Sequence, residues 1–476
     1  MFTQRSTGGT TTMRLGMKPA DSWLTLLMGV SFLVLAQGAL AADAGALGTS
    51  LTAAGGDPGA SSDGMVPAIE NASPQLPGWT WGKPRKDFFK YKDDKPIYSV
   101  TSQNYERYIQ FLSPGQIAHL KQDAKFRMDV YPSRRICTIP DFVAENTKKN
   151  VGLAKLGTDG WSLSDAVLPA IPFPMPGNGA EAMWNMKIRY RGVGVDWKKE
   201  NTSLSPRPGS DEWIRAIQEQ TIYFPWGEKG SHKLSDLPKY DSMIYFSYFS
   251  PTAQAGQAVV GSSSFNETGS EAYYYFPGQR RVRRMPTYSY DAPEVGSENT
   301  YLVDEAFMFN GPLDRFDWKL AGKKELIVPY NALDVYNFNG NETDLVQSNG
   351  LDPSIRRYEI HRVWVVEASV KEGMRHVSPK RTYYLDEDSW NALLAEDYDA
   401  KGAIWKVREG YLIPVYELGT CDVEAFAQYA LQDNRFLFDD AVLGRGVDAR
   451  WVTEADGPKF HTGFYNAENL RAISDR

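Results

Sequence analysis

The sequence predicts an α+β fold: a large curved antiparallel β-sheet covered by helices, with a mainly helical part toward the N-terminus. Helix signals with capping residues gather in residues 97–211. From residue 212 onward, β-branched and aromatic runs follow one another between Gly, Pro, Asn and Asp. The links between these runs are too short for βαβ units, which favours an antiparallel meander. Such a sheet must bury one apolar face from solvent. Helices that cover this face of a curved sheet give a half-barrel.

Residues 1–41 have the pattern of a secretory signal peptide. Arg14 and Lys18 precede the apolar run WLTLLMGVSFLVLA, and Ala39 and Ala41 form an A-x-A pattern after it. The run is shorter than the ~20 residues of a comfortable membrane span, although an uncleaved anchor is the alternative. No later stretch is apolar for long enough to span a bilayer as a helix. We therefore expect a cleavable signal peptide, a periplasmic location and no transmembrane span in the mature chain.

Composition argues against nucleic-acid binding and leaves open whether the two cysteines form a disulfide. The 476 residues carry a formal charge of -7, so the chain lacks the general positive field that drives non-specific nucleic-acid binding. We expect no nucleic-acid partner. Cys137 and Cys421 either pair in an oxidising compartment or serve as small buried hydrophobic residues.

The segment before the helices divides in two. Residues 42–64 are rich in Ala, Gly, Ser and Asp, which is typical of a flexible lead-in. Residues 65–96 combine prolines with aromatics, and because proline disfavours both helices and central strands they predict an extended arm lying on a folded body. Together residues 42–96 form a lead-in and a proline-aromatic arm.

Four helices are expected in residues 97–211. Ser113 is a predicted N-cap with Pro114 at the first helical position, and Asn178 with Glu181 three residues later forms a predicted capping box. The four expected helices cover residues 101–112, 113–126, 140–150 and 178–192. In the last of them Ala182, Met183, Met186 and Tyr190 share one face, which favours packing on a core.

Residues 212–443 are predicted to form the half-barrel, and residues 444–476 a loosely helical C-terminal tail. Strands are expected in the runs TIYFPW, SMIYFSYFS, EAYYYF, RRVRRM, KKELIVPY, YEIHRVWVVEASV, KRTYYLDED, SWNALLAEDYD and GAIWKVREGYLIPVYEL. Two hairpin turns are predicted, at residues 276–279 and 399–402.

Catalytic motifs are scarce in this sequence. It contains no G-x-S-x-G, H-E-x-x-H, Walker or G-x-G-x-x-G pattern, and its five histidines are far apart. We therefore expect no enzyme activity, catalytic residue, bound metal or cofactor. Strand alternation does place Glu359 beside His361, either as a base with its orienting partner or as a polar pair on a half-buried sheet. The acidic run 386–388 lacks the spacing of a calcium loop, which favours a solvated hairpin turn.

The stretch YYYFPGQRRVRR places tyrosines near arginines on a predicted hairpin. Alternation puts Tyr273 and Tyr275 on one face of the first strand, and Arg281 and Arg283 together on one face of the return strand. One interpretation is a structural ladder in which the arginines cover apolar surface and bridge to acids such as Asp304 or Glu305. The other is a site for an anionic head group.

Several segments resemble a proteobacterial periplasmic family of unknown function, the domain-of-unknown-function 1329 family, labelled outer-membrane lipoprotein-sorting-like. They are FRMDVYPSRR, PFPMPGNGAEAMWN, PGQRRVRRMP, LDRFDWKLAGKKELIVPYNA, RRYEIHRVWVVEASVKEGMRHVSPKRTYYLDEDSW and DYDAKGAIWKV, spread over residues 126–407. The resemblance implies kinship with the LolA and LolB lipoprotein carriers, whose incomplete barrel encloses an apolar cavity. It also implies envelope transport beside an exporter and an outer-membrane protein. No catalytic residue is carried over from the family. The two cysteines depart from its pattern.

The function expected from the sequence is a periplasmic carrier or binding protein for a lipid or other hydrophobic ligand. Aromatic residues make up 13% of the chain, and a curved sheet lined with them would shelter such a ligand. The candidate ligand-binding residues are Trp184, Met183, Met186, Tyr273, Tyr275, Arg281, Arg283, Trp318, Trp364 and Trp405. The alternatives are an adaptor that binds exporter subunits through the arm at 65–96, and an envelope hydrolase built on Glu359 and His361.

Overall fold

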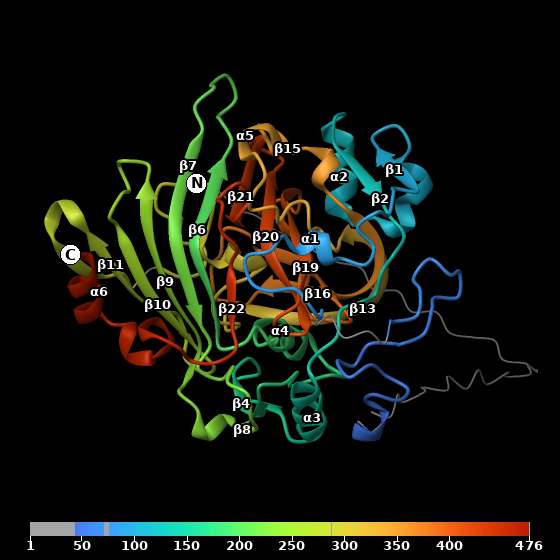
Figure 1. The fold of residues 1–476 in the computed structure, drawn as a ribbon, viewed down its shortest axis with the longest axis horizontal. Helices are drawn as coiled ribbons and strands as arrows, with labels where there is room; N and C mark the ends of the chain where they lie inside the picture. The colour runs from blue at the N-terminus through green and yellow to red at the C-terminus, as the bar shows by residue number, and fades with distance from the viewer. Residues whose placement is uncertain (1–42, 71–75, 287, 476) are drawn as a thin grey trace, which may run out of the picture. The chain divides into compact units, whose positions relative to one another are not determined.

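The structure is a computed structural model that describes residues 43–70, 76–286 and 288–475. The predicted signal peptide lies outside these residues. None of the helices in this described part has the length and apolar character that crossing a bilayer requires. The predicted fold class is confirmed, because a large open sheet forms the body and helices cover both of its faces (Figure 1).

Helices are few and mostly short. The α-helices are α1 (Arg85–Phe88), α2 (Pro114–Gln122), α3 (Asp141–Asn150), α4 (Gly179–Lys187), α5 (Glu342–Leu345) and α6 (Ala467–Ser474). The 3-10 helices are η1 (Ala44–Ala46), η2 (Tyr105–Phe111), η3 (Leu234–Asp236), η4 (Pro277–Gln279), η5 (Val303–Met308), η6 (Pro353–Ile355), η7 (Pro458–Phe460) and η8 (Thr462–Phe464). Residues 101–112 thus hold a 3-10 helix where the sequence predicted an α-helix.

Two of the predicted helix starts, at Ser113 and Asn178, are confirmed. The Ser113 side chain accepts a hydrogen bond from the backbone N–H of Gln116, and the Gln116 side chain accepts one from the backbone N–H of Ser113. At α4 the Asn178 side chain accepts from the backbone N–H of Glu181. The Glu181 carboxylate accepts from the backbone N–H of Gly177, one residue before the position the capping box predicts.

Strands account for most of the body. They are β1 (Tyr98–Thr101), β2 (Arg127–Val130), β3 (Lys155–Leu156), β4 (Leu163–Asp165), β5 (Val167–Leu168), β6 (Gly194–Leu204), β7 (Ile214–Tyr223), β8 (His232–Lys233), β9 (Tyr240–Ser250), β10 (Ala258–Ser264), β11 (Glu271–Phe276), β12 (Arg281–Arg284), β13 (Phe316–Pro329), β14 (Val346–Gln347), β15 (Gly350–Leu351), β16 (Tyr358–Val370), β17 (Lys380–Asp386), β18 (Ala392–Tyr398), β19 (Ile404–Val415), β20 (Thr420–Ala430), β21 (Arg435–Ala441) and β22 (Arg450–Val452). Both predicted hairpins, β11–β12 and β18–β19, are present.

The main sheet has 16 strands within the described residues, and it consists of two meanders joined side by side. The N-terminal half-sheet runs β6-β7-β9-β10-β11-β12, and the C-terminal half-sheet runs β13-β16-β17-β18-β19-β20-β21. Antiparallel pairing of β21 with β6 connects them. Figure 1 shows the green strands of the first half beside the orange and red strands of the second. The small strands β1 and β2 join through one parallel contact between β2 and β16, and β22 pairs with β6.

Two sets of helices define two faces of this sheet. The inner face is the one that α4 contacts at β13 and β16 and that η5 contacts at β18, β19 and β20. On the opposite, outer face, α2 contacts β19 and α6 contacts β10, β11 and β12. Alternation along each strand sends one set of side chains to each face. On β19, for example, Lys406 faces η5 while Val407 faces α2.

Cys137 and Cys421 form a disulfide across 284 positions of sequence. The bond joins the segment after β2 to the start of β20. The sequence left open whether the two cysteines pair or are buried free thiols. The structure shows that they pair.

The described part of residues 42–96 lies on the body. Arg85 is fully buried and its guanidinium pairs with Glu417 at 2.8 Å. Trp81 donates from its indole N–H to the backbone carbonyl of Ala449 at 3.1 Å, and the Trp390 indole donates to the backbone carbonyl of Ala54 at 2.9 Å. These contacts fix the segment along the C-terminal half-sheet.

Candidate functional site

Two adjoining pockets lie on the inner face of the N-terminal half-sheet. Each has about 80 Å³ that the centre of a water-sized sphere can reach, within gaps of about 800 Å³ and 760 Å³ that include open solvent. The two share five lining residues: Ile244, Tyr288, Val303, Phe307 and Asn310. We treat them as one elongated space and call it the inner cavity.

Strand register explains why the floor of the cavity is continuous. Ile222 on β7 pairs with Ile244 on β9, and Gln220 pairs with Phe246. Because paired residues in an antiparallel sheet point to the same face, β7 and β9 present these side chains together. Ala216 and Leu204 extend the apolar floor toward β6. The cavity therefore has a floor of aliphatic and aromatic side chains interrupted by glutamines.

The opposite wall comes from residues 288–311, which we call the cover segment. Phe307 within it has φ of 54°, a left-handed conformation that is uncommon for a bulky residue. The backbone kinks at this point in η5. The kink lets Asp304 and Glu305 reach the C-terminal half-sheet while Phe307 lines the cavity. One short stretch thus both anchors the wall and shapes it.

Buried ion pairs hold the cover segment in place. Asp304 pairs with Arg381 on β17 at 2.7 Å, and Glu305 pairs with Lys406 on β19 at 2.7 Å. Asp397 on β18 pairs with Arg381 at 3.1 Å. The Arg381 guanidinium offsets the burial of Asp304 and Asp397, so the pKa of Asp304 falls below its usual range and that of Asp397 falls to about 2. The anchor therefore stays charged near neutral pH.

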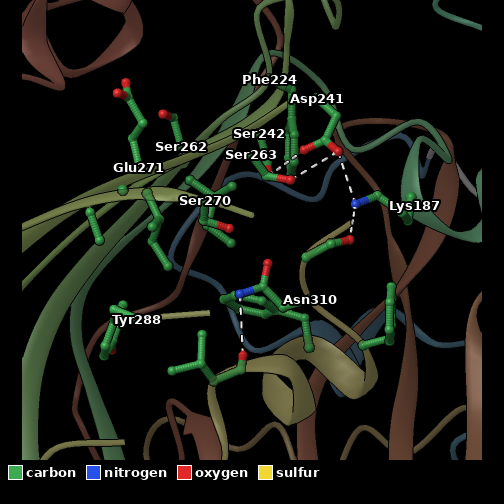
Figure 2. A pocket seen from close by; sticks show the side chains of 18 of the residues that line it. Lys187, Phe224, Asp241, Ser242, Ser262, Ser263, Ser270, Glu271, Tyr288 and Asn310 are labelled. Carbon is green, nitrogen blue, oxygen red and sulfur yellow. Dashed lines mark hydrogen bonds and ion pairs between the residues drawn. The ribbon is translucent and has the colours of Figure 1, made fainter. Parts of the chain in front are cut away.

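One end of the cavity carries a satisfied ion pair (Figure 2). The Lys187 ammonium lies 2.9 Å from the Asp241 carboxylate. The hydroxyls of Ser242 and Ser263 donate to the same carboxylate at 2.9 Å and 3.1 Å. Lys187 also donates to the backbone carbonyl of Gly311, which ties α4 to the end of the cover segment. This end can offer hydroxyls and a fixed dipole to a polar group.

The other end carries buried carboxyl groups that form no ion pair with the described residues. Burial raises the pKa of Glu294 to about 7, and the Tyr288 hydroxyl donates to it. Deeper in, burial and the neighbouring Asp439 raise the pKa of Asp440, and burial and Asp440 raise that of Glu200. Glutamine side chains from β7 donate to Glu200 and Asp440. These acids favour the neutral form, so they add hydrogen-bonding capacity without a strong charge.

Of the ten candidate residues from the sequence, Met186 on α4 lines the inner cavity. Met183 and Trp184, on the same helix, are fully buried in the core beside it. The Trp184 indole N–H donates to the backbone carbonyl of Trp161 at 2.6 Å, and that bond fixes its orientation. Of the three candidate ligand-binding residues on α4, only Met186 lines the cavity.

The predicted tyrosine and arginine candidates lie on opposite faces of the N-terminal half-sheet. Tyr275 packs under α6 on the outer face, and Tyr273 lies beside it. Arg281 and Arg283 are exposed on the edge strand, where they pair in register with Phe276 and Tyr274. The structure therefore does not bring these four residues together.

The expected bridges from these arginines to Asp304 or Glu305 are wrong. Arg284 pairs with Glu271 at 3.1 Å, while Asp304 and Glu305 bind Arg381 and Lys406. The physical reason is register, since β12 is the edge strand and faces solvent, whereas the cover segment turns toward β17–β19.

The remaining three candidates, all half-buried, lie on the C-terminal half-sheet. Trp318 packs against Phe309 and donates to the backbone carbonyl of Leu313 at 2.8 Å. Trp364 stacks on Trp390 with 6.0 Å between ring centroids. Trp405 donates to Asp433 at 3.1 Å. Each of these tryptophans has a packing role in its own neighbourhood, away from the inner cavity.

The sequence analysis missed most of the cavity lining. The run SMIYFSYFS did carry a usable signal, because its alternation separates Ile244 and Phe246 from Met243 and Tyr245. The cover segment carried no such signal. Tyr288, Glu294 and Phe307 lie in irregular backbone, and no periodicity predicts the direction of their side chains.

The pair Glu359 and His361 is confirmed as a contact, with 3.0 Å between Glu359 Oε2 and His361 Nε2. Both residues are almost completely buried. Glu359 also accepts hydrogen bonds from Arg357 at 2.7 Å and Asn331 at 3.0 Å. The geometry matches a hydrogen-bonded polar pair inside the sheet.

Comparison with known proteins gives one family and several distant structures. A family model described as "Protein of unknown function (DUF1329)" matches residues 99–471. An uncharacterized protein of Pseudomonas aeruginosa is 33% identical over 406 residues, which cover 83% of this chain and 86% of that protein.

Three solved structures are similar at lower levels. An outer membrane lipoprotein-sorting protein domain from Vibrio parahaemolyticus has a TM-score of 0.41 and 14% identity, covering 62% of this chain and 98% of that one. A DUF1329 family protein from Desulfovibrio piger has a TM-score of 0.37 and 14% identity, covering 57% and 91%. A LolA superfamily protein from Nitrosomonas europaea has a TM-score of 0.32 and 11% identity, covering 62% and 99%.

Proposed function

The chain belongs to the DUF1329 family, and from the inner cavity we propose that it is a non-enzymatic carrier or binding protein for a lipid or other amphipathic hydrophobic ligand. The observation that carries the proposal is the position of the cavity. It lies on the inner face of an open curved sheet, between β7, β9 and β10 and the cover segment. An open sheet leaves one side through which a ligand can enter without the sheet being broken.

The lining of the cavity suits a chain-like apolar ligand with a polar end. Its floor and wall offer these apolar side chains: Leu204, Ile214, Ala216, Ile244, Phe246, Val303, Phe307 and Leu437. Burying an acyl chain gains about 0.8 kcal/mol for each CH₂ group, so a few buried groups give useful affinity. Polar partners lie at both ends, with Lys187 and Asp241 at one and Glu294 at the other. Ligand sites commonly combine an apolar lining with a few fixed polar groups.

Two features support an envelope location for this carrier. The first 41 residues have the pattern of a cleavable export signal. The disulfide between Cys137 and Cys421 is of a kind that persists in oxidising compartments such as the periplasm. The proposal therefore includes a role in moving hydrophobic compounds through the envelope, with an exporter and an outer-membrane protein as partners.

The test is to fill the cavity and measure ligand binding. Ala216 lies on the floor, and Ala216→Trp would occupy the apolar part of the cavity. We expect purified wild-type protein to carry lipid detectable by native mass spectrometry and to bind a dansyl-labelled fatty acid. Ala216→Trp should carry no lipid and should bind the fatty acid at least about tenfold more weakly, a loss of about 1.4 kcal/mol.

The matched control is Ser247→Trp, which adds the same side chain on the outer face of the same half-sheet. Ser247 on β9 pairs with Glu219 on β7, and its neighbour Tyr245 packs under α6. Near-UV circular dichroism should show both variants folded. Absence of lipid and of fatty-acid binding in folded wild-type protein would count against the carrier proposal, as would equal losses in the two variants.

A further inference from the structure

A second cluster of chemically versatile side chains lies away from the inner cavity, where β16 meets the turn between β17 and β18. His361, Asp386 and Asp388 each place a nitrogen or oxygen ligand atom within 4.8 Å of the others. Their exposures are 1%, 0% and 2%. The sequence predicted a solvated hairpin turn for residues 386–388, and this is wrong. The N-terminal segment covers the turn, and Arg135 and Arg362 reach into it.

The hydrogen bond to Glu359 fixes which nitrogen of a neutral His361 ring carries the proton. Glu359 is paired with Arg357 at 2.7 Å and is therefore an ionised carboxylate, which can only accept hydrogen bonds. Its contact with His361 Nε2 thus needs the proton of that nitrogen. The lone pair of the neutral ring then sits on Nδ1, and Nδ1 is buried with no partner among the described residues. Tyr330 stacks on the ring at 3.5 Å and holds its plane.

Asp386 is the second group with an unused atom. Its Oδ2 accepts from the Ser389 hydroxyl at 2.6 Å and from the Tyr330 hydroxyl at 3.2 Å. Its Oδ1 is buried and has no partner among the described residues. Burial without a partner is costly for the Asp386 oxygen and for the His361 nitrogen. Each atom has lost its hydrogen bonds to water and has no hydrogen bond from the protein in their place.

The cations near this turn are paired with Glu387 and Asp388. Arg135 holds Asp388 through two hydrogen bonds of 2.8 Å and 2.9 Å. Lys323 and Arg362 pair with the intervening Glu387. Within the part of the chain that the structure describes, Asp386 pairs with neither an arginine nor a lysine, so its Oδ1 is available to bind a metal ion.

We propose that His361, Asp386 and Asp388 form a binding site for one divalent transition-metal ion, for which Zn²⁺ is the best match. Imidazole nitrogen with carboxylate oxygen is a donor set that zinc accepts. Zinc bonds of about 2.0–2.2 Å hold tetrahedral donors about 3.4 Å apart, so a small inward movement of these side chains completes the site. The hydrogen bond from Nε2 to Glu359 is the carboxylate–histidine arrangement that orients metal-bound imidazole.

The location gives the ion a structural role. It would join β16, through His361, to the β17–β18 turn, through Asp386 and Asp388. The N-terminal segment lies over the same turn, where Trp390 donates to the backbone carbonyl of Ala54 and Arg135 to that of Asp57. A neighbouring pocket lined by Ala54, Pro58 and Cys137 reaches Asp388 and offers the ion an approach. The ion would therefore stabilise the covered turn and the segment above it.

The experiment uses the untagged mature chain, stripped with a chelator and dialysed into metal-free buffer. Zn²⁺ alone is then added, excess ion is removed by gel filtration, and bound metal is counted by inductively coupled plasma mass spectrometry. We expect about one zinc per chain and a rise in the thermal unfolding midpoint with free Zn²⁺. The same concentration of Mg²⁺ should leave the midpoint unchanged, because Mg²⁺ prefers a shell of oxygens.

The decisive variant is Asp386→Asn. It keeps the size of the side chain and an oxygen that accepts from the Ser389 and Tyr330 hydroxyls, so the stripped variant should unfold close to the wild-type temperature. We expect its zinc affinity to fall about 100-fold or more, as for His361→Gln, with no midpoint rise on adding Zn²⁺. The matched controls are His461→Gln and Asp334→Asn, at accessible positions outside the cluster, which should retain one zinc.

Two results would overturn the proposal. One is folded wild-type protein that retains no zinc and shows no midpoint change, which would leave a buried water as the occupant of the gap. The other is wild-type stoichiometry in Asp386→Asn and His361→Gln, which would place the metal elsewhere. Neither result depends on ligand binding in the inner cavity, so this inference and the carrier proposal are tested separately.

Discussion

The two half-sheets have the same meander topology but use their inner faces differently. In the C-terminal half-sheet, charged residues under the cover segment pair with one another, as Arg381 does with Asp304 and Asp397. In the N-terminal half-sheet, the inner face borders a cavity, and its acids Glu200 and Glu294 pair with no lysine or arginine among the described residues. The C-terminal half-sheet thus holds the cover segment through ion pairs, and the N-terminal half-sheet forms one wall of the cavity.

The opposite pKa shifts at the anchor and beside the cavity follow from this difference. The neighbouring Arg381 lowers the pKa of Asp304 and Asp397, whereas burial without a cation raises that of Glu200 and Glu294. The same kind of antiparallel meander can therefore border either a charged core or a cavity. Which of the two it borders depends on the side chains that its inner face carries.

The largest expected effect comes from removing the anchor. Asp304→Ala leaves His376 without its buried carboxylate and Arg381 with Asp397 alone, and we expect it to lower the free energy of unfolding by about 3–5 kcal/mol. Urea denaturation at pH 7 measures the change. Asp334→Ala is the control, since its ion pair with Lys86 is partly exposed and should contribute less than about 1 kcal/mol. Similar losses in both variants would remove the distinction between the half-sheet that holds the cover segment and the one that borders the cavity.

The next effect is pH-dependent. The folded pKa of Glu294 is about 7, above its ordinary value of 4.5, so the folded state binds this proton more tightly than the unfolded state. Its contribution to stability is therefore full below about pH 4.5 and is lost as pH rises through 7. Glu294→Gln removes that loss. We expect the variant to gain about 1–3 kcal/mol over wild type at pH 8 and close to nothing at pH 4.5.

Thermal or urea unfolding at several pH values measures the gain from Glu294→Gln. A gain that is the same at pH 4.5 and pH 8 would mean that Glu294 does not titrate in the folded cavity. A gain that grows with pH would sharpen the contrast with the anchor, whose carboxylates contribute stability that is lost as pH falls.

The smallest expected effect is the difference in stability between two Ala→Leu substitutions, one in the core and one in the cavity. Ala368 on β16 is fully buried in the core of the C-terminal half-sheet, and Ala216 lines the inner cavity. Ala368→Leu should cost about 1–3 kcal/mol through overpacking, while Ala216→Leu should cost less than about 1 kcal/mol because the added methyl groups enter free space. Chemical denaturation of both variants tests this. A larger cost at Ala216 would indicate that the cavity is rigid and filled.

Sequence reasoning predicted the elements better than their contacts. Alternation and turn residues located β9, β11 and β12 and both hairpins, and the caps Ser113 and Asn178 located α2 and α4. The candidate site was harder, because most of its wall is irregular backbone. The aromatic residues that the sequence offered are mainly core residues, such as Trp184, since an aromatic side chain fills a core as readily as it lines a cavity.

By itself the sequence determined strands such as β9, β11 and β16 and membership of the family, since each of these is written in local residue order, and it predicts an export signal in residues 1–41. The tertiary structure decided the rest. Pairing of β21 with β6 joined two meanders from distant parts of the chain, and Cys137 met Cys421. Burial of Asp386 and the turn of Asp304 toward Arg381 also depend on segments far apart in sequence. Local propensity fixes where a strand runs, whereas a cavity or an ion pair exists only where separate elements meet.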